Sequence, residues 1–266
     1  MAELHCTLTA LDLVFLQNGL DRATLAVIGT CRSLESLDIS DAMKTTVPYS
    51  EMRAIAAGWG RLSTFRCRSR QTTSLGCNVL RAVGESCPLI KNLQADYMYE
   101  MDLCSFAGHD LRELQVSGSF SEAALMSVLR PTLRHVKISS ASLSDAVLAC
   151  LQERCSGALE ELVIEGFYDR NSISASAVLG CVVSCVSLKK FYIDCCAGIA
   201  QYGPGVWANA GFDCSLKQEV VADLHWTSTA LQLARSSRRP RPGGATRIVH
   251  RPISSLSEDL NDIFDT

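Results

Sequence analysis

The stretch that decides the fold runs from residue 133 to residue 164 and reads LRHVKISSASLSDAVLACLQERCSGALEELVI. It opens with an apolar triplet, Leu133, Val136 and Ile138, and the same spacing returns 26 residues later. The second and third members of a triplet lie two residues apart, so they share one face of a β-strand. Between the two triplets, apolar residues recur at helical spacing, namely Leu143, Val147, Leu148 and Leu151. A strand and a helix with one apolar face each cannot close a core alone, so copies of this unit must stack.

The same triplet recurs along the whole chain, which predicts a repeat array. Its copies begin at Leu8, Leu34, Leu62, Ile90, Leu111, Leu133, Leu159, Leu188 and, less clearly, Val221, the last copy being Val221, Leu224 and Trp226. Successive copies are separated by 21 to 33 residues, or about 27 on average. This period lies near the range of about 20–29 residues that is typical of leucine-rich repeats.

On these triplets the chain resembles the leucine-rich-repeat family, and it is similar in particular to the cysteine-containing repeats of F-box substrate receptors. In that subfamily a cysteine ends the helix before the next triplet, and here Cys31, Cys87 and Cys185 each precede a triplet by three residues. The resemblance implies an α/β solenoid with a curved parallel sheet on its concave side and helices on its convex side. No F-box fits before Leu8, so we expect either a partner over the first layer or a shortened relative of a longer protein.

Composition and charge narrow the class of protein. The chain has 266 residues, 47% of them hydrophobic, and its net charge of −3 gives no overall reason to expect a nucleic-acid partner. Its 13 cysteines are odd in number and follow the repeat, and no secretory signal is visible. We therefore expect reduced, buried thiols in a cytoplasmic protein, with nuclear or organellar locations left open. No apolar run reaches the roughly 18–20 residues of a membrane-spanning helix, so membrane insertion is not expected.

Three regions follow from these patterns. Residues 1–233 form the predicted solenoid of about nine units, with helical connectors over 50–60, 74–87, 121–130 and 174–185 and a Gly-rich loop over 197–215. Residues 234–254 are rich in Arg and Pro and predict a disordered linker. Residues 255–266 are acidic and begin with a capping box of Ser255 and Glu258. This tail is either a frayed end or a helix that docks through one apolar face, formed by Leu256, Leu260, Ile263 and Phe264.

The sequence contains no recognisable catalytic pattern. Its five histidines are scattered, no phosphate-binding GxxxxGK[ST] loop occurs, and no Ser or Cys forms a known motif with a His and a carboxylate. Cys181 and Cys185 have a spacing that metal sites use, but no histidine lies nearby in sequence to complete a set of ligands. We therefore expect structural thiols, no metal, no cofactor and no enzyme activity.

The remaining candidate site is the concave face of the predicted sheet, where residues between the apolar members of each triplet point outward. Charge is zoned along this face, and it carries Arg and Tyr, which are common in interface hot spots. The predicted partner-binding residues are Asp38, Arg66, Arg68, Arg70, Gln94, Asp96, Tyr97, Gln115, His135, Lys137, Glu165, Tyr192 and Asp194. A solvated sheet face without a partner would also be polar, and this is the competing interpretation.

These observations favour a non-enzymatic interaction module or scaffold subunit that binds one or more protein partners on its concave face. Two alternatives remain open. The resemblance implies a substrate-recognition component of an SCF-type ubiquitin ligase, which would act through a separate linker protein. An RNA-binding role would instead use the cluster from Arg66 to Arg70 together with the Arg-rich linker, and its sign would be a steep dependence of affinity on salt.

Overall fold

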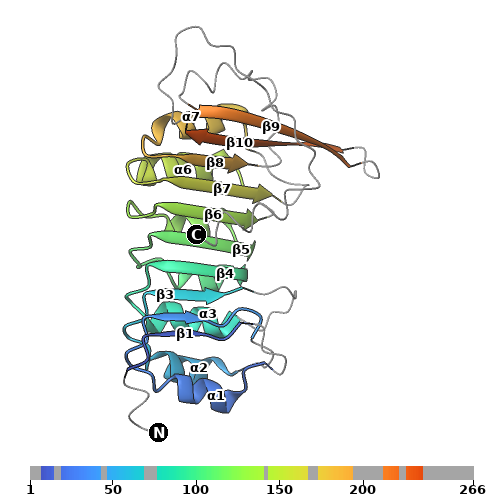
Figure 1. The fold of residues 1–266 in the computed structure, drawn as a ribbon. Helices are drawn as coiled ribbons and strands as arrows, with labels where there is room; N and C mark the ends of the chain where they lie inside the picture. The colour runs from blue at the N-terminus through green and yellow to red at the C-terminus, as the bar shows by residue number, and fades with distance from the viewer. Residues whose placement is uncertain are drawn as a thin grey trace.

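The computed structural model describes residues 7–14, 19–42, 47–68, 77–140, 143–166, 173–193, 212–221 and 226–235, the last two as backbone alone. Strands and helices alternate along the chain from the N-terminus (Figure 1). The described elements are β1 (Ala10–Asp12), α1 (Arg22–Ile28), β2 (Ser36–Asp38), α2 (Tyr49–Ala56), β3 (Thr64–Cys67), α3 (Cys77–Ser86), β4 (Asn92–Tyr99), α4 (Glu100–Cys104), β5 (Glu113–Ser119), α5 (Glu122–Val128), β6 (His135–Ser140), α6 (Asp145–Cys155), β7 (Glu161–Gly166), α7 (Ala175–Ser184), β8 (Lys190–Ile193), β9 (Phe212–Val221) and β10 (Trp226–Arg235).

Strands β1 to β8 form one parallel sheet in chain order, each strand pairing with the next (Figure 1). The register aligns equivalent positions of neighbouring triplets, as in the series Leu114, Val136, Leu162 and Phe191. The predicted α/β fold, a parallel sheet whose strands alternate with helices, is therefore confirmed in the described part of the chain.

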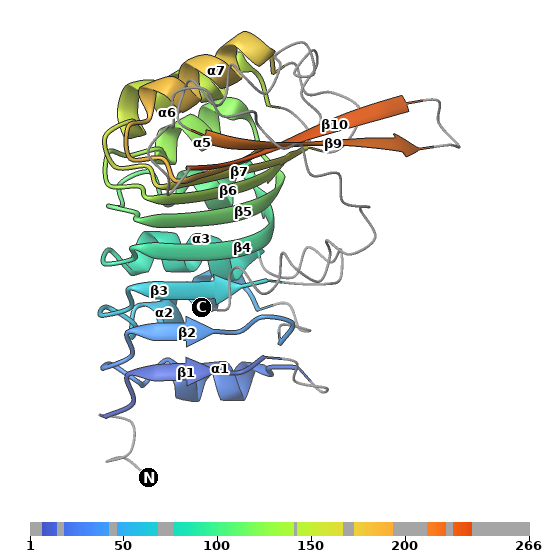
Figure 2. The same ribbon diagram turned by 45° about the horizontal axis from the view of Figure 1, so that its top comes forward.

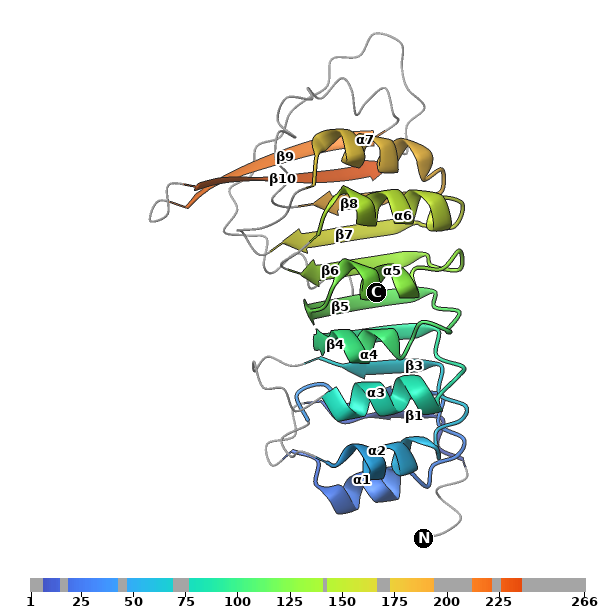
Figure 3. The ribbon, with the colours of Figure 1, turned by 180° about the vertical axis from the view of Figure 1, so that it is seen from behind.

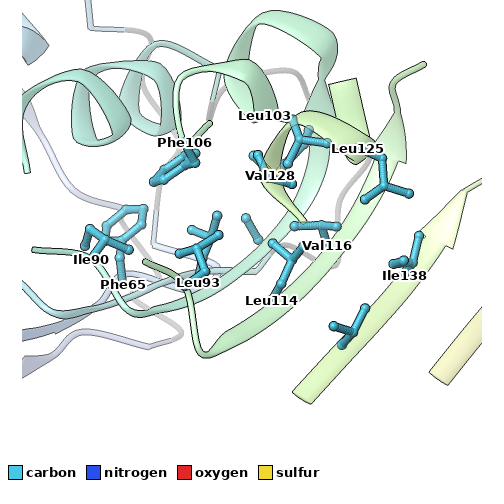
Figure 4. Close-up of a cluster of buried hydrophobic side chains, with 14 of the residues drawn as sticks. Phe65, Ile90, Leu93, Leu103, Phe106, Leu114, Val116, Leu125, Val128 and Ile138 are labelled. Atoms are coloured by element: carbon cyan, nitrogen blue, oxygen red, sulfur yellow. The ribbon is translucent and has the colours of Figure 1, made fainter. Parts of the chain in front are cut away.

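The apolar triplets form the core between the sheet and the helices. Seven first members are at most 1% exposed: Leu34, Leu62, Ile90, Leu111, Leu133, Leu159 and Leu188. Figure 4 shows second and third members such as Leu93, Leu114 and Ile138 lying below Leu103, Phe106 and Val128 of the helical layer. Each layer of the core therefore rests on the layers before and after it, as expected of a stacked repeat.

The helices α1 to α7 lie on one face of the sheet, which Figures 2 and 3 show from two sides. The four predicted connectors correspond to α2, α3, α5 and α7. Serine caps fix two of these helices: the Ser121 and Ser174 hydroxyls accept the backbone N–H groups of Ala124 and Ala177, both at 3.2 Å. The shortest connector, α4, follows an eight-residue strand in the 21-residue unit that begins at Ile90, so little chain remains for a helix there.

Glycines at the ends of α1 and α2 let these neighbouring units approach closely. A Cβ atom at position 58 would lie 1.8 Å from the Gly29 carbonyl oxygen, so only glycine fits there. Directly after Gly58, the indole N–H of the buried Trp59 donates to the Ile28 carbonyl at 3.0 Å. The Gly58–Trp59 pair thus joins the second helical unit to the first through backbone contact and one buried hydrogen bond.

The ninth unit predicted from Val221, Leu224 and Trp226 is not a parallel repeat. Val221 ends β9 and Trp226 begins β10, and the two strands pair antiparallel, while β10 also pairs antiparallel with β8. Only residues 222–225 separate these strands, whereas a parallel connection needs a crossover of about a dozen residues. The antiparallel pair extends past the ends of the other strands (Figure 1).

Two predicted boundaries also change at this end of the chain. β9 begins at Phe212, inside the loop predicted over 197–215, and β10 ends at Arg235, past the predicted end of the solenoid at residue 233. The remainder of that loop, the linker from residue 236 and the tail 255–266 lie outside the described residues.

Leu162→Ala tests the stacked core. Leu162 is fully buried between Val136 and Phe191, so its truncation leaves a cavity, and we expect a loss of about 2–5 kcal/mol in the free energy of unfolding. The control is Val183→Ala, which also removes apolar atoms but from a side chain of α7 that is 59% exposed. We expect the control to change stability by less than about 0.5 kcal/mol in urea unfolding followed by circular dichroism. Equal losses for both variants would contradict the assignment of the core.

Gly58→Ala tests the close approach of α1 and α2. The new methyl group would overlap the Gly29 carbonyl oxygen, and backbone movement to relieve this contact costs about 1–3 kcal/mol. Gly60→Ala is the matched control, because no atom lies within 4 Å of a Cβ at position 60. Thermal unfolding should therefore show a lower Tm for Gly58→Ala and little change for Gly60→Ala.

Candidate functional site

The sheet face opposite the helices, here called the open face, carries three rows of side chains in register. The first row contains Ser36, Thr64, Asn92, Glu113, His135, Glu161 and Lys190. The second row contains Asp38, Arg66, Gln94, Gln115, Lys137, Val163 and Tyr192. The third row contains Ser40, Arg68, Asp96, Ser117, Ser139 and Glu165. No described helix lies over this face (Figures 2 and 3).

Alternating charges link β6, β7 and β8 in the first row. Glu161 lies between two basic side chains: His135 Nδ1 is 3.5 Å from one carboxylate oxygen, and Lys190 Nζ is 3.8 Å from the other. The contact with His135 lowers the pKa of Glu161 despite partial burial, and Lys190 adds to this effect. The same contact raises the pKa of His135. Each charge therefore favours the ionised form of its neighbour.

A second set of pairs crosses the adjacent rows. Lys137 Nζ lies 3.0 Å from one oxygen of Glu165, and the Ser139 hydroxyl donates to the other at 2.7 Å. The Gln94 amide donates to Glu113 at 2.6 Å, and the Ser117 hydroxyl donates to Asp96 at 3.0 Å. These contacts connect β4 to β5 and β6 to β7 through side chains, so the polar groups of these strand pairs are held in defined positions.

A shallow hollow lies between β5, β6 and β7 on the open face. Its lining includes Glu113, Gln115, His135, Lys137, Glu161 and Val163. Charges of both signs stand around the apolar Val163, which is only 6% exposed. The hollow is thus a small depression with an apolar floor and polar edges.

The second candidate region lies on β3 and its neighbours. Arg66 is half-buried and Arg68 is exposed, as predicted for an outward-facing strand. Asp38, predicted to contact a partner, is only 8% exposed, and its carboxylate accepts the backbone N–H of Ser40 at 2.9 Å. This local bond turns the Asp38 carboxylate toward its own strand end, so Asp38 shapes that end rather than presenting a free charge.

Strand β4 contains an irregularity beside this region. The register with β5 shifts between Ala95 and Met98, and Tyr97 has a positive φ of 55°. On the other side of the shift, Gly118 of β5 lies against Met98, and a Cβ at position 118 would be 2.2 Å from the Met98 carbonyl oxygen. The half-buried Tyr97 side chain is thus carried at a bulge on the rim of the open face.

The structure brings together most of the predicted site residues. Gln94, Gln115, His135, Lys137, Glu165 and Tyr192 share the central part of the open face. The prediction did not include Glu113, Glu161 or Lys190, although their period-two spacing from Gln115, Val163 and Tyr192 would have indicated them. Arg70, Asp194 and the tail residues lie outside the described residues.

The described cysteines are free thiols, and burial governs their chemistry. It raises the pKa of Cys87 and Cys155 to about 12. Cys181 and Cys185 are buried with their sulfur atoms 4.0 Å apart, and this contact, together with burial, raises the pKa of Cys181. Across the described residues, no group of three or more potential ligands is arranged to hold a metal ion.

No protein-family model matches the chain, and no curated protein matches it either. None of the helices in the described ranges has both the length and the apolar character needed to cross a bilayer.

Glu161→Gln tests the pairing of His135. The Glu161 contact raises the folded-state pKa of His135 above its ordinary value of 6.5, so removing that charge should lower this pKa. The contact between Glu161 and His135 also makes the stability of the folded protein depend on pH. The stabilisation is fully present below pH about 6.5 and is lost as the pH rises through the raised folded-state pKa. An NMR titration of His135 measures the shift, and Glu165→Gln, on the same face, should leave the His135 pKa unchanged.

Proposed function

We propose that the chain is a non-enzymatic protein-interaction module, or a scaffold subunit of a larger assembly, that binds a protein partner on its open face. One observation carries the proposal: an eight-stranded parallel sheet presents one face that no described helix covers. Its polar side chains are aligned by strand register and held by contacts between neighbouring strands.

Rigid presentation of this kind favours binding. Side chains on strands lose little freedom when a partner arrives, because pairs such as Lys137–Glu165 already fix their positions. The central part of the face combines paired charges, the hollow around Val163 and the half-buried Tyr192. An aromatic anchor surrounded by polar groups is the composition of many protein-binding hot spots.

We further infer that the repeats are of the leucine-rich type, with the open face as the concave side. The units within the parallel sheet begin 21 to 29 residues apart, and each described unit contributes one short strand and at most one helix. The cysteines that precede triplets are buried: Cys87 and Cys185 directly follow α3 and α7, as the resemblance implies, and Cys31 lies three residues past the end of α1. Such arrays commonly offer an extended binding surface.

Tyr192→Ala tests the proposed binding face. Phe191 and Ile193 on either side are buried, so the half-buried Tyr192 points to the open face, and its loss should leave the core intact. If Tyr192 is a hot spot, the Kd for the partner should rise roughly 30-fold, which corresponds to about 2 kcal/mol. The measurement is isothermal titration calorimetry with a partner identified by co-purification with the full chain.

Val183→Ala is the matched control for Tyr192→Ala. It lies in α7, the helix that directly precedes β8, but on an exposed helical surface rather than on the sheet. The partner should bind Val183→Ala as it binds the unchanged protein. A partner that tolerates Tyr192→Ala but is lost with Val183→Ala would place the interface on the helices and refute the proposal.

A further inference from the structure

Two arginines, Arg66 in β3 and Arg68 directly after it, differ from the other basic residues of the open face in having no ionic partner among the described residues. His135, Lys137 and Lys190 are paired with Glu161 or Glu165. Arg66 and Arg68 form no ion pair with any residue in the described part of the chain. The basic side chains over β6 to β8 are thus paired with carboxylates of the open face, whereas Arg66 and Arg68 are not paired within the described residues.

The neighbours of Arg66 direct their polar groups elsewhere. Asp38, in register on β2, uses its carboxylate to accept the Ser40 N–H at 2.9 Å. Gln94, in register on β4, donates its amide to Glu113 at 2.6 Å, on the side away from β3. Both adjacent strands therefore place a polar residue beside Arg66 without binding its guanidinium.

Arg66 also has an unsatisfied donor in a buried position. Its Nε atom is inaccessible to solvent and has no hydrogen-bond partner among the described residues. Burying such a donor without a partner is unfavourable, so the Arg66 side chain gains stability by moving to a position in which an acceptor can reach its N–H groups. An arginine fork matches the geometry of a carboxylate, which accepts two parallel N–H bonds.

We propose that Arg66 and Arg68 bind two carboxylates of an extended acidic segment of the protein partner, a step that rests on the proposed function of the open face. Arg66 lies in β3, and Arg68 directly follows its last residue, Cys67. The chain stays paired with the β2 segment there, because the Arg68 N–H donates to the Ser40 hydroxyl at 3.0 Å and the Arg68 carbonyl accepts the Asp41 N–H at 2.8 Å. The two side chains therefore leave the sheet on the same face, about 6.7 Å apart along the chain. A partner segment in β conformation repeats its side chains with the same period. Glu or Asp at alternate positions therefore brings one carboxylate to each guanidinium.

The surrounding charges favour an acidic peptide over a nucleic acid. Beyond β3 the open face carries Asp96, Glu113, Glu161 and Glu165, and the whole chain has a net charge of −3. A nucleic acid strand carries a phosphate on every nucleotide and would meet these carboxylates as it crossed the sheet. Two carboxylates at strand spacing need only the two arginines.

The test measures binding of a labelled alternating Ser–Glu peptide to the full chain by fluorescence anisotropy. The double variant Arg66→Gln/Arg68→Gln should weaken binding about tenfold or more, since both charge-assisted contacts are lost. The matched control is Arg53→Gln/Arg154→Gln, which removes the same charge from exposed side chains of α2 and α6. It should change affinity less than about twofold.

Further ligands distinguish an alternating acidic peptide from other acidic peptides and from a nucleic acid. A Ser–Gln peptide should not bind, and a peptide of the same composition with its glutamates in one block should bind more weakly than the alternating one. The proposal is overturned if both double variants weaken binding equally or if the alternating peptide fails to bind at low salt. Tighter binding of single-stranded RNA, with a steep salt dependence that Arg66→Gln/Arg68→Gln reduces, would also overturn it.

The outcome is distinguishable from that of the Tyr192 experiment. If the acidic peptide fails but the natural partner is still lost with Tyr192→Ala, the open face binds its partner without Arg66 and Arg68. If the partner is insensitive to Tyr192→Ala as well as to Arg66→Gln/Arg68→Gln, the open face itself is not the interface.

Discussion

The structure depends on one constraint: each apolar triplet is buried only because the triplets of the neighbouring strands lie beside it in register. Leu162 has Val136 on one side and Phe191 on the other, and no single unit encloses its own core. Strand side chains alternate between the two faces, so a slip of one residue would move a whole triplet from the core to solvent. Burial of the triplets thus fixes the register of the entire parallel sheet.

The same constraint determines the open face. Once Leu162 is aligned with Val136 and Phe191, Glu161 must lie between His135 and Lys190. Ion pairs of this exposure contribute little to stability, so they follow from the register rather than create it. In the proposed function their consequence is to decide which charges of the open face are neutralised internally and which remain available to a partner.

The repeat could be predicted from patterns within a single unit. Contacts between units could not be predicted in this way. The triplets from Leu34 to Leu188 and the helical connectors depend on residues within one unit, and the structure confirms them in the described part of the chain. The antiparallel β9–β10 pair was not predicted, because Val221, Leu224 and Trp226 have the same spacing as an apolar triplet. The burial of Asp38 depends on the backbone at the end of β2, where its carboxylate binds the Ser40 N–H. The Gly58–Gly29 contact depends on how closely the ends of α1 and α2 approach. Residue spacing in the sequence predicts neither. Likewise, Arg66 has no ionic partner among the described residues because the Asp38 side chain binds the Ser40 N–H and the Gln94 side chain binds Glu113.

The two regions of the open face would contribute differently to a complex. The charges over β6 to β8 are paired with one another, so in the proposed complex this part would contribute mainly through shape, the hollow around Val163 and Tyr192, which would govern how slowly a partner dissociates. Arg66 and Arg68 form no ion pair among the described residues, so in the proposed complex they would attract acidic groups and set how fast a partner arrives. Salt would therefore slow association through Arg66 and Arg68 while leaving dissociation nearly unchanged, since screening acts most on exposed charges. A strand register set by apolar packing would in this way divide recognition into a steering region and an anchoring region on one sheet.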